Sequence, residues 1–482
     1  MSLAATPAPP TTIRGVHDVI QFTNSRPRIS GRAGVIWWLA LAGLFLDAFS
    51  NSALSAGLAP MTRDLQLSAA QVALLTSMAS WISIFFNPIG GWLADRFGRV
   101  IPIVAAKVLY VIGAALATFA PSFELVVAGR FFVGAAYGMD FAIAMALLGE
   151  LTPKKFSSRI NTWQGIWYTA VTSNLLLALA FYNLDVGDAI WRYAIGATGV
   201  VAILLFVLQL TFLVESPAWL ARHGNLERAA ESMTKMYGQP FVAAPEGERL
   251  PIINLANKGI RNVLLIFRGI YLPRTVLATT VQLGQSIQYF AVGWYLPVIS
   301  LAMFGNDFVS ATTGTIVFNL FGIIGGFASP WIGKKLGLRR ASAIGFTVVF
   351  VLLVILGLGF QKMPLWLAFL VPSLFILFHS GGPGANGKSI STLSFRSELR
   401  AGANGLIGAM GGLGAALGLT VFPIFRESYG LGNTFLILAV VPLIAAIICW
   451  VVRWEPTRAE VDVDEEADAP GFSDEPTRTK VM

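Results

Sequence analysis

Charged residues, cysteine and histidine are all scarce in this chain of 482 residues. Only 12% of the residues are charged, against about 25% in ordinary soluble domains, whereas 55% are hydrophobic. This composition excludes a soluble enzyme of this size and disorder of the bulk of the chain. The single cysteine, Cys449, excludes an intramolecular disulfide, a thiolate metal cluster and a Cys-pair redox site, and three histidines argue against a His-built metal site. We expect no metal and no cofactor.

Long apolar runs fill the chain instead. A helix needs about 20 mostly apolar residues to cross a bilayer, and twelve stretches meet this requirement. The 48 glycines and 13 tryptophans agree, because glycine and interfacial tryptophan are enriched in membrane helices. We predict an all-α integral membrane protein with twelve transmembrane helices at Val35–Leu58, Val72–Ala94, Ile101–Ala120, Leu125–Leu148, Trp163–Phe181, Tyr193–Leu213, Leu272–Phe304, Thr312–Ile332, Ala343–Phe360, Leu365–Ser380 (running on towards Ser391), Ala403–Phe422 and Thr434–Val452.

The positions of the basic residues predict the orientation of the chain. If the amino terminus is cytoplasmic, 29 of the 34 Lys and Arg residues lie in inward segments, Lys107 and Lys388 among them. Four lie in outward loops, and Arg130 is left within a span. The positive-inside rule therefore predicts both termini in the cytoplasm, in a cell membrane. It also explains the net charge of +8 without a nucleic-acid partner.

The longest interruption divides the predicted spans six and six. We expect a flexible cytoplasmic tail (1–32), a first six-helix bundle (33–213), a linker (214–271), a second six-helix bundle (272–454) and an acidic, disordered cytoplasmic tail (455–482). Within the linker, Leu226–Met236 and Asn257–Phe267 have helical character.

A glycine-rich basic turn occurs once in each half. After the second span the sequence reads Gly91-x-x-x-Asp95-Arg96-x-Gly98-Arg99, and Gly337 stands in the matching place after the eighth span, 239 positions from Gly98. Two related halves around a midplane site are typical of secondary transporters. The Asp95 carboxylate can accept hydrogen bonds from a helix start or pair with a cation, so the turn could latch the two halves together. A basic loop that only sets topology is the alternative.

This turn resembles the signature of the major facilitator superfamily. Arg130-x-x-x-Gly134-x-x-x-Gly138, Glu150-Leu-Thr-Pro153 and Glu215-Ser216-Pro217-x-Trp219 further resemble its sugar-porter and metabolite:proton symporter branch, and the resemblance runs from about Val35 to Arg458. It implies two pseudo-symmetric six-helix bundles. It also implies a cytoplasmic gate formed by Gly91, Asp95, Arg96, Gly98, Arg99, Glu150, Arg159, Glu215 and Arg400.

The sequence departs from that branch in informative places. The carboxy-terminal half has Lys334 where the branch repeats the acidic residue of the turn, so the gate should depend on the amino-terminal half. In the seventh span, hexose porters carry a glutamine pair and an asparagine. This chain has Gln282, Gln285 and Gln288 in a different register, with Phe290 where the asparagine would fall. A hexose substrate is therefore not favoured.

A charge within a span costs on the order of 2.5–3.5 kcal/mol, and three ionisable residues within predicted spans stand out: Asp47, Arg130 and Asp140. Asp47 resembles the first-span carboxyl that carries the proton in proton-coupled sugar porters, working against the fourth-span arginine, here Arg130. Burial favours the protonated carboxyl and a nearby arginine the ionised one, so a changing Asp47–Arg130 distance would load and release a proton. A structural ion pair is the alternative. Asp140, nearer the bilayer middle, could bind substrate, bind the proton or line a wet cavity.

Amide and aromatic side chains within the spans suit a polar organic solute. Gln164 and Tyr168, four residues apart, share a helix face in the fifth span. The candidate substrate-binding residues are Gln164, Tyr168, Gln282, Gln285, Gln288, Trp294 and His379. For Trp294, interfacial anchoring is the alternative. His379 could titrate near neutral pH, but a lone histidine in a span is more often held by an interhelical hydrogen bond.

One nucleotide-binding pattern is rejected. Gly382-Pro-Gly-Ala-Asn-Gly387-Lys388-Ser389 matches GxxxxGK[ST], which cradles phosphates only between a strand and a helix. Here it lies in an apolar run without that alternation. A kinked, cavity-facing stretch of the tenth span is the better interpretation, and we expect no ATP.

These observations predict a secondary transporter that couples proton flow to uptake of a small polar organic metabolite by alternating access. Organic acids, including aromatic ones, come first as substrates, and sugars or polyols second, with Arg130 and the glutamines as contacts for an anion. A proton-antiport exporter of drugs or metabolites and a non-transporting receptor on the same fold are the alternatives. An enzyme is not expected, because no set of acid, base, metal and nucleophile converges. We expect a monomer.

Overall fold

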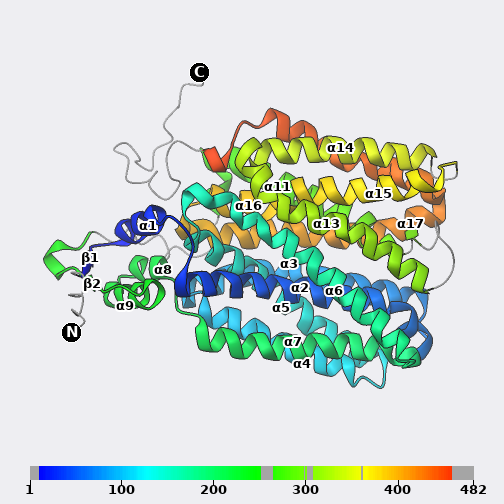
Figure 1. Ribbon diagram of the computed structural model, residues 1–482, viewed down its shortest axis with the longest axis horizontal. Helices are drawn as coiled ribbons and strands as arrows, with labels where there is room; N and C mark the ends of the chain where they lie inside the picture. The colour runs from blue at the N-terminus through cyan, green and yellow to red at the C-terminus, as the bar shows by residue number, and fades with distance from the viewer. Residues whose placement is uncertain (1–9, 251–263, 298, 301–307, 360–361, 459–482) are drawn as a thin grey trace, which may run out of the picture.

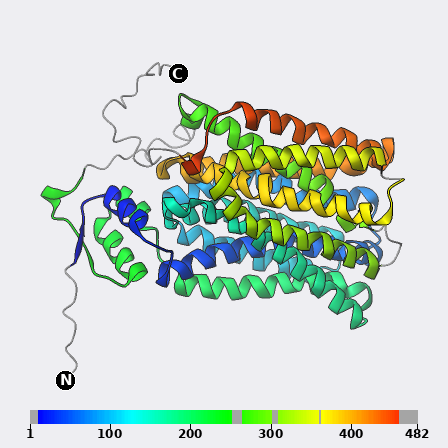
Figure 2. The ribbon, with the colours of Figure 1, turned by 45° about the horizontal axis from the view of Figure 1, so that its top comes forward.

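The chain folds as a bundle of long, roughly parallel helices (Figure 1). The computed structural model describes residues 10–250, 264–297, 299–300, 308–359 and 362–458. The helices between residues 31 and 212 gather in one half of the bundle, and the helices from residue 271 onward gather in the other (Figures 1 and 2). The two halves lie side by side along their length.

Six helices form the first half and follow the predicted apolar runs. These apolar runs form helices because backbone N–H and C=O groups inside a bilayer have no water to bind and must pair within their own segment. A capping box between Ser68 and Gln71 begins the second of these helices. The helices are α2 (Gly31–Asp64), α3 (Ala69–Phe97), α4 (Val100–Thr118), α5 (Phe123–Leu151), α6 (Trp163–Asn183) and α7 (Ile190–Phe212), with short turns η1 (Lys154–Thr162) and η2 (Gly187–Ala189) between them.

The second half contains two helices that are interrupted by a π-turn. The π-turn η6 (Tyr289–Gly293) follows α11 (Tyr271–Gln288), and η7 (Ser380–Gly384) separates α15 (Leu365–His379) from α16 (Ala385–Ser394). At Gly382 the backbone leaves helical geometry, as expected for the kink in the tenth span. The remaining elements are η5 (Leu264–Phe267), α13 (Phe308–Leu336), α14 (Leu338–Gly359), α17 (Ser397–Val451) and η8 (Pro456–Arg458).

Ten described segments are long and apolar enough to cross a membrane. One of them, Gly402–Val451, contains two crossings, because the backbone of Gly430 (φ +77°) breaks α17 into two helices. The less apolar α11, with η6, supplies the twelfth. The predicted fold of twelve transmembrane helices in two six-helix bundles is confirmed.

The amino-terminal segment is not the flexible tail that the sequence predicts. Residues 11–13 form β1 (Thr11–Ile13), which pairs in parallel with β2 (Phe241–Ala243), and α1 (Val16–Ser25) follows. Together with α8 (Pro217–Arg222), α9 (Leu226–Tyr237) and η3 (Glu246–Glu248), they form a small unit at one end of the bundle (Figure 2). Its core includes Ile13, Val19, Leu220, Met233 and Phe241. The sequence did not indicate this unit, because the first segment is proline-rich and the residues that it packs against lie more than 200 positions further along the chain.

The linker helix expected at Leu226–Met236 is present as α9. Of the second expected linker helix, Asn257–Phe267, residues 257–263 lie outside the described part of the chain, and the rest forms the short turn η5. The acidic tail beyond residue 458 also lies outside it.

Glycine contacts bring the two halves together. The glycine-rich first half of α17 packs on α3, where a Cβ at Gly405 would lie 2.6 Å from the Asn87 carbonyl oxygen. On another side of the interface Gly326 of α13 lies against the backbone of Gly165 in α6. Small residues permit such close helix approach inside membranes.

Candidate functional site

The central cavity lies between the halves and takes side chains from both. Its lining combines amides, aromatic rings and one ammonium group: Asn87, Tyr137, Phe141, Trp163, Gln164, Trp167, Gln282, Gln285, Ser286, Tyr289, Phe290, His379, Lys388, Gly408, Gly411 and Gly412. Such a mixture of apolar rings and a few polar groups is typical of small-molecule sites.

Four of the seven predicted substrate residues line this cavity: Gln164, Gln282, Gln285 and His379. Gln288 does not line it, because its side-chain amide lies 2.7 Å from Nδ1 of His379. This bond is the interhelical hydrogen bond that the alternative interpretation of His379 expects. Tyr168 does not line this cavity; its ring packs against Gly322 of α13 and meets Tyr289 edge-on. Trp294 lines a second cavity instead.

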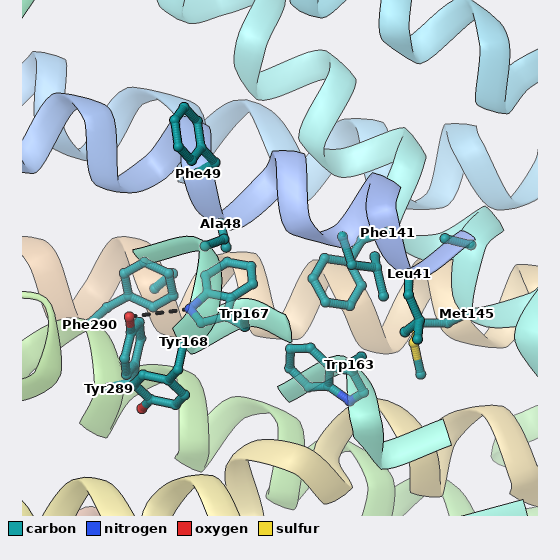
Figure 3. Close-up of a cluster of buried hydrophobic side chains, with 14 of the residues drawn as sticks. Leu41, Ala48, Phe49, Phe141, Met145, Trp163, Trp167, Tyr168, Tyr289 and Phe290 are labelled. Carbon is teal, nitrogen blue, oxygen red and sulfur yellow. Dashed lines mark hydrogen bonds between the residues drawn. The ribbon is translucent and has the colours of Figure 1, made fainter. Parts of the chain in front are cut away.

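An aromatic wall separates the central cavity from this second cavity. Trp167, Tyr289 and Phe290 line both, and the Trp167 indole N–H donates to the Tyr289 hydroxyl over 3.2 Å (Figure 3). Trp167 comes from α6 of the first half and the other two from η6 of the second. The π-turn thus places two adjacent rings across the interface. The second cavity is lined further by polar residues such as Asn51 and Asn319.

A cluster of charges lies beside the central cavity, within the first half. Lys107 of α4 and Asp140 of α5 form an ion pair of 2.5 Å, with exposed side-chain fractions of 0% and 1%. On α2, Asp47 is also fully buried, and its Oδ1 accepts a 2.6 Å hydrogen bond from Tyr110, whereas its Oδ2 has no hydrogen-bond partner among the described residues. The Asp47 and Asp140 carboxylates and the Lys107 ammonium are near enough to interact electrostatically. We call Asp47, Lys107, Tyr110 and Asp140 the buried charge cluster.

Arg130 does not pair with Asp47 as the sequence comparison implies. It lies buried on α5, no ion pair of the described structure involves it, and its guanidinium interacts electrostatically with Tyr110, the hydrogen-bond donor to Asp47. The cations that act on Asp47 directly are Lys107 and Lys388. Sequence analysis assigned both to the cytoplasmic segments, which was wrong, because both lie within membrane spans.

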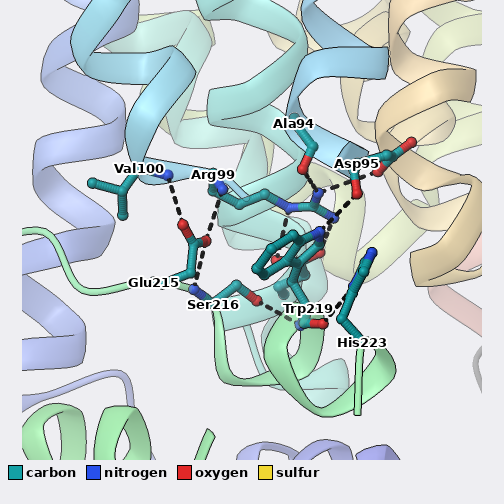
Figure 4. A network of polar contacts seen from close by, with 9 residues as sticks. Ala94, Asp95, Arg99, Val100, Glu215, Ser216, Trp219 and His223 are labelled. Atoms are coloured by element: carbon teal, nitrogen blue, oxygen red, sulfur yellow. Dashed lines mark hydrogen bonds and ion pairs between the residues drawn. The ribbon is translucent and has the colours of Figure 1, made fainter. Parts of the chain in front are cut away.

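Several of the predicted gate residues form a polar network at one end of the bundle (Figure 4). Arg99, only 1% exposed, pairs with Glu150 over 2.7 Å and with Asp95 over 3.2 Å. Burial opposes the charge of Arg99, but Glu150 and Asp95 outweigh it and hold the pKa of Arg99 above its ordinary value. The indole of Trp219 donates to the Asp95 carbonyl over 2.9 Å. Arg400 reaches this network from the second half and interacts with Glu150.

Glu215 has a distinct role in the same network. It follows α7 and accepts hydrogen bonds from the backbone N–H groups of Arg99 and Val100, the start of α4. Gly98 (φ +90°) permits this turn, since a Cβ there would collide with the Glu215 carboxylate. Glu455 repeats the arrangement at Gly337 (φ +85°), where the N–H groups of Leu338 and Arg339 donate to it over 2.9 Å each.

Three predicted gate residues make none of these contacts. Arg96 is exposed and lies over the rings of Trp92 and Phe97, and Arg159 is exposed over Phe156. Gly91 is buried within α3. The halves are joined nearby by contacts that the sequence did not indicate. The Asn161 amide donates to the Asn386 oxygen over 2.6 Å, and the Trp163 indole donates to the Ala385 carbonyl over 3.0 Å.

The fold and this site define a membrane transporter of the major facilitator type. The model of the family described as "Sugar (and other) transporter" matches residues 36–458, so the chain belongs to that family. Its relatives include the "Putative metabolite transport protein YaaU" of Escherichia coli, 26% identical over 438 residues, which are 89% of this chain and 92% of YaaU. "Inositol transporter 4" of Arabidopsis thaliana is 28% identical over 60% of this chain and 51% of its own length.

Solved structures of the xylose transporter XylE share the fold. The structure described as the proton:xylose symporter XylE bound to 6-bromo-6-deoxy-D-glucose superposes with a TM-score of 0.77 at 18% identity, over 91% of this chain and 99% of XylE. An inward-open conformation of XylE from E. coli gives a lower TM-score of 0.67, over 90% and 99% of the two chains.

Proposed function

We propose that this chain is a proton-coupled symporter that carries a small polar organic metabolite across the cell membrane by alternating access. Family membership supports transport, and relatives named for a metabolite, inositol and xylose support a small polar substrate. Organic acids and sugars or polyols both suit a cavity lined by amides and aromatic rings. The orientation with both termini in the cytoplasm remains our proposal from the basic residues, as does a monomeric, non-enzymatic and ATP-independent transporter.

The buried carboxyl of Asp47 is the observation that carries the proton-coupling proposal. Its Oδ2 is buried without a partner, and an uncompensated carboxylate in such a place is costly. The group therefore suits a proton carrier that is ionised only when a cation approaches. The nearby Lys107 ammonium is already paired with the Asp140 carboxylate. A small shift of α2, α4 or α5 would therefore change how strongly Lys107 acts on Asp47.

Two barriers support alternating access around the central cavity. The aromatic wall closes it on one side, and the Arg99 network and the Asn161–Asn386 bond close it on the other. Both barriers include contacts between the halves, so rocking of one half against the other would open one barrier while keeping the second. Arg130 would then act on Asp47 through Tyr110, not as its direct partner.

Replacement of Asp47 by Asn tests the coupling. In proteoliposomes with an inward gradient of one pH unit, a 1:1 symporter can accumulate its labelled substrate about tenfold. We expect the Asp47→Asn variant only to equalise the substrate concentration on the two sides of the membrane, because an amide cannot take up and release the coupled proton. Exchange of labelled for unlabelled substrate across the membrane should continue.

Asp188→Asn is the matched control, since Asp188 is exposed and pairs only with Arg63 among described residues. It should accumulate substrate like the wild type. Tenfold accumulation by the Asp47→Asn variant would refute its role as the proton carrier. Failure of the wild type to accumulate any member of a panel of labelled organic acids, sugars and polyols would refute proton-coupled uptake.

A further inference from the structure

Lys388 places a positive charge in the wall of the central cavity. It lies in the first turns of α16, within the membrane span Trp366–Ser394, and only 9% of the residue is exposed. Its ammonium lies 4.1 Å from the centroid of the Phe141 ring, which belongs to α5 of the opposite half. Lys388 therefore reaches across the interface and faces the space where a substrate would sit.

No carboxylate of the described residues neutralises this ammonium within 4.0 Å. Two buried cations of the first half have such a partner, since Lys107 is paired with Asp140 and Arg99 with Glu150. Buried Arg130, like Lys388, is in no ion pair of the described structure. The face of an aromatic ring attracts a cation, but more weakly than a carboxylate at hydrogen-bonding distance. None of the described residues that line the cavity is Asp or Glu. Asp47 acts on Lys388 only from beyond ion-pair distance. A carboxylate in direct contact with this buried cation would therefore arrive with the substrate.

The remaining polar groups of the cavity are suited to hydroxyl groups. The side-chain oxygens of Asn87, Gln164 and Gln282 are buried and have no hydrogen-bond partner within the described part of the chain. Each can accept a hydrogen bond from a donor, and a substrate hydroxyl supplies one. Rings such as Trp163 and Phe141 offer apolar faces for the C–H groups of a hydroxylated carbon chain. A molecule that carries both hydroxyl groups and a carboxylate would complement these amide oxygens and the Lys388 ammonium.

We infer that the substrate is a hydroxylated monocarboxylate, a sugar acid of the aldonate or uronate type, whose carboxylate binds the Lys388 ammonium and whose hydroxyls bind the unpartnered amide oxygens. This inference rests on the proposed transport function and narrows its substrate class. A neutral sugar would satisfy the amides but leave Lys388 without a counter-charge. A phosphate ester would bring about two negative charges to a single cation.

The same placement links the substrate to the proton. Lys388 is near enough to Asp47 to act on it electrostatically. A carboxylate bound at Lys388 offsets the positive charge that Asp47 otherwise experiences. Substrate and proton therefore each favour the binding of the other, which is the reciprocity expected of coupled sites. One monoanion and one proton carry no net charge, so the transport cycle with a sugar acid is electroneutral.

Counterflow in proteoliposomes of the full-length protein tests the substrate class, because this exchange needs no proton gradient. Labelled D-gluconate is the acidic probe, and labelled D-glucose and myo-inositol are the neutral ones. We expect gluconate to exchange with a KM at least about tenfold below those of the neutral probes. Lys388→Met, which keeps length and removes charge, should raise the KM for gluconate about 10- to 150-fold, the loss expected for a hydrogen bond to a charged group. The same substitution should change the KM values for D-glucose and myo-inositol by no more than about twofold.

Lys362→Met is the matched control, because Lys362 is exposed in the loop before α15. Lys388→Met should also fold, since replacing a buried charge by an apolar chain of similar size is seldom destabilising. Lys388→Arg should restore part of the preference for gluconate. Equal or better exchange of glucose and inositol by the wild type, or equal effects of Lys388→Met on acid and neutral probes, would overturn the inference while leaving transport intact.

Ligand-dependent thermal stability in detergent separates failure of this inference from failure of the proposed function. We expect gluconate, but not glucose, to raise the melting temperature of the wild type, and Lys388→Met to abolish this shift. If gluconate stabilises the wild type through Lys388 but no probe is transported, the site assignment stands and the transport proposal falls. If only neutral probes stabilise the protein, the assignment falls. An imposed membrane potential should leave gluconate uptake unchanged; potential-driven gluconate uptake would overturn the electroneutral cycle.

Discussion

At the scale of single residues, Gly43 determines how closely α2 approaches the buried charge cluster. A Cβ at this position would lie 2.8 Å from Oδ2 of Asp140 and 3.3 Å from Nζ of Lys107. Both side chains belong to an ion pair, between Nζ of Lys107 and Oδ1 of Asp140, that is fully enclosed. Asp47 is one helical turn further along the same helix. The glycine thus brings the proposed proton carrier and the ion pair into one cluster.

We predict that Gly43→Ala forces the Lys107–Asp140 pair to move and destabilises the protein by about 1–3 kcal/mol, the usual cost of overpacking. The measurements are the melting temperature in detergent and the accumulation of labelled substrate under a pH gradient. Gly247→Ala is the control, because a Cβ at Gly247 meets nothing within 4 Å. Identical stability and accumulation in the two variants would show that α2 does not constrain the pair.

The individual charges were harder to predict from the sequence than the helices that carry them. Asp47 and Asp140 were recognised because carboxyls in the middle of apolar runs have no topological explanation. Lys107 lies seven residues and Lys388 six residues from the nearer end of its span, where the positive-inside rule already accounts for a basic residue. Only the packing of α4 and α16 against α5 shows that these ammonium groups are enclosed.

At the scale of secondary-structure elements, the carboxylates of Glu215 and Glu455 act as caps supplied from a distance. The first N–H groups of a helix lack partners within the helix, and here a glutamate that follows a later helix accepts from two of them. The sequence indicated the Gly98 and Gly337 repeat, but it could not show which carboxylate each turn receives. The π-turn η6 was equally hidden, because an irregular turn inside an apolar run leaves the hydrophobic pattern unchanged.

We predict that Glu215→Ala and Glu455→Ala each destabilise the protein by about 1–3 kcal/mol, because two backbone donors lose a charged acceptor. The double variant should show the sum of the two effects within about 0.5 kcal/mol, since the caps share no partner. Melting temperatures in detergent measure this, with the exposed Glu427→Ala as control. A strongly non-additive double variant would mean that the two caps are parts of one cooperative network.

At the scale of the whole molecule, the apolar runs predicted twelve crossings and two halves, and both are present. The small unit of β1, α1, α8, α9 and β2 was not predicted, because its strands are separated by more than 200 residues and only three residue pairs join them. It attaches the start of the chain to the linker, and the Asn24 side chain accepts from the N–H of Lys154 at the start of η1. Short pairings between distant segments carry almost no local signal.

The two glutamate caps also have a mechanical consequence. Glu215 follows the last helix of the first half and binds the third helix of the same half, and Glu455 does the same in the second. Each half is therefore closed on itself, and neither cap crosses to the other half. Rocking can break the contacts of Arg400 and Asn386 while both caps stay intact.

We predict that the protein still works when it is made as two separate chains, 1–250 and 251–482, which should co-purify and exchange labelled substrate. A cut after Pro153 is the control, because it separates Glu215 from the helix that it caps and should abolish assembly. Equal activity from both divided forms, or none from the first, would contradict this picture. If it holds, the continuity of the chain at residue 250 is only a tether, and the transporter moves as two rigid halves and not as twelve separate helices.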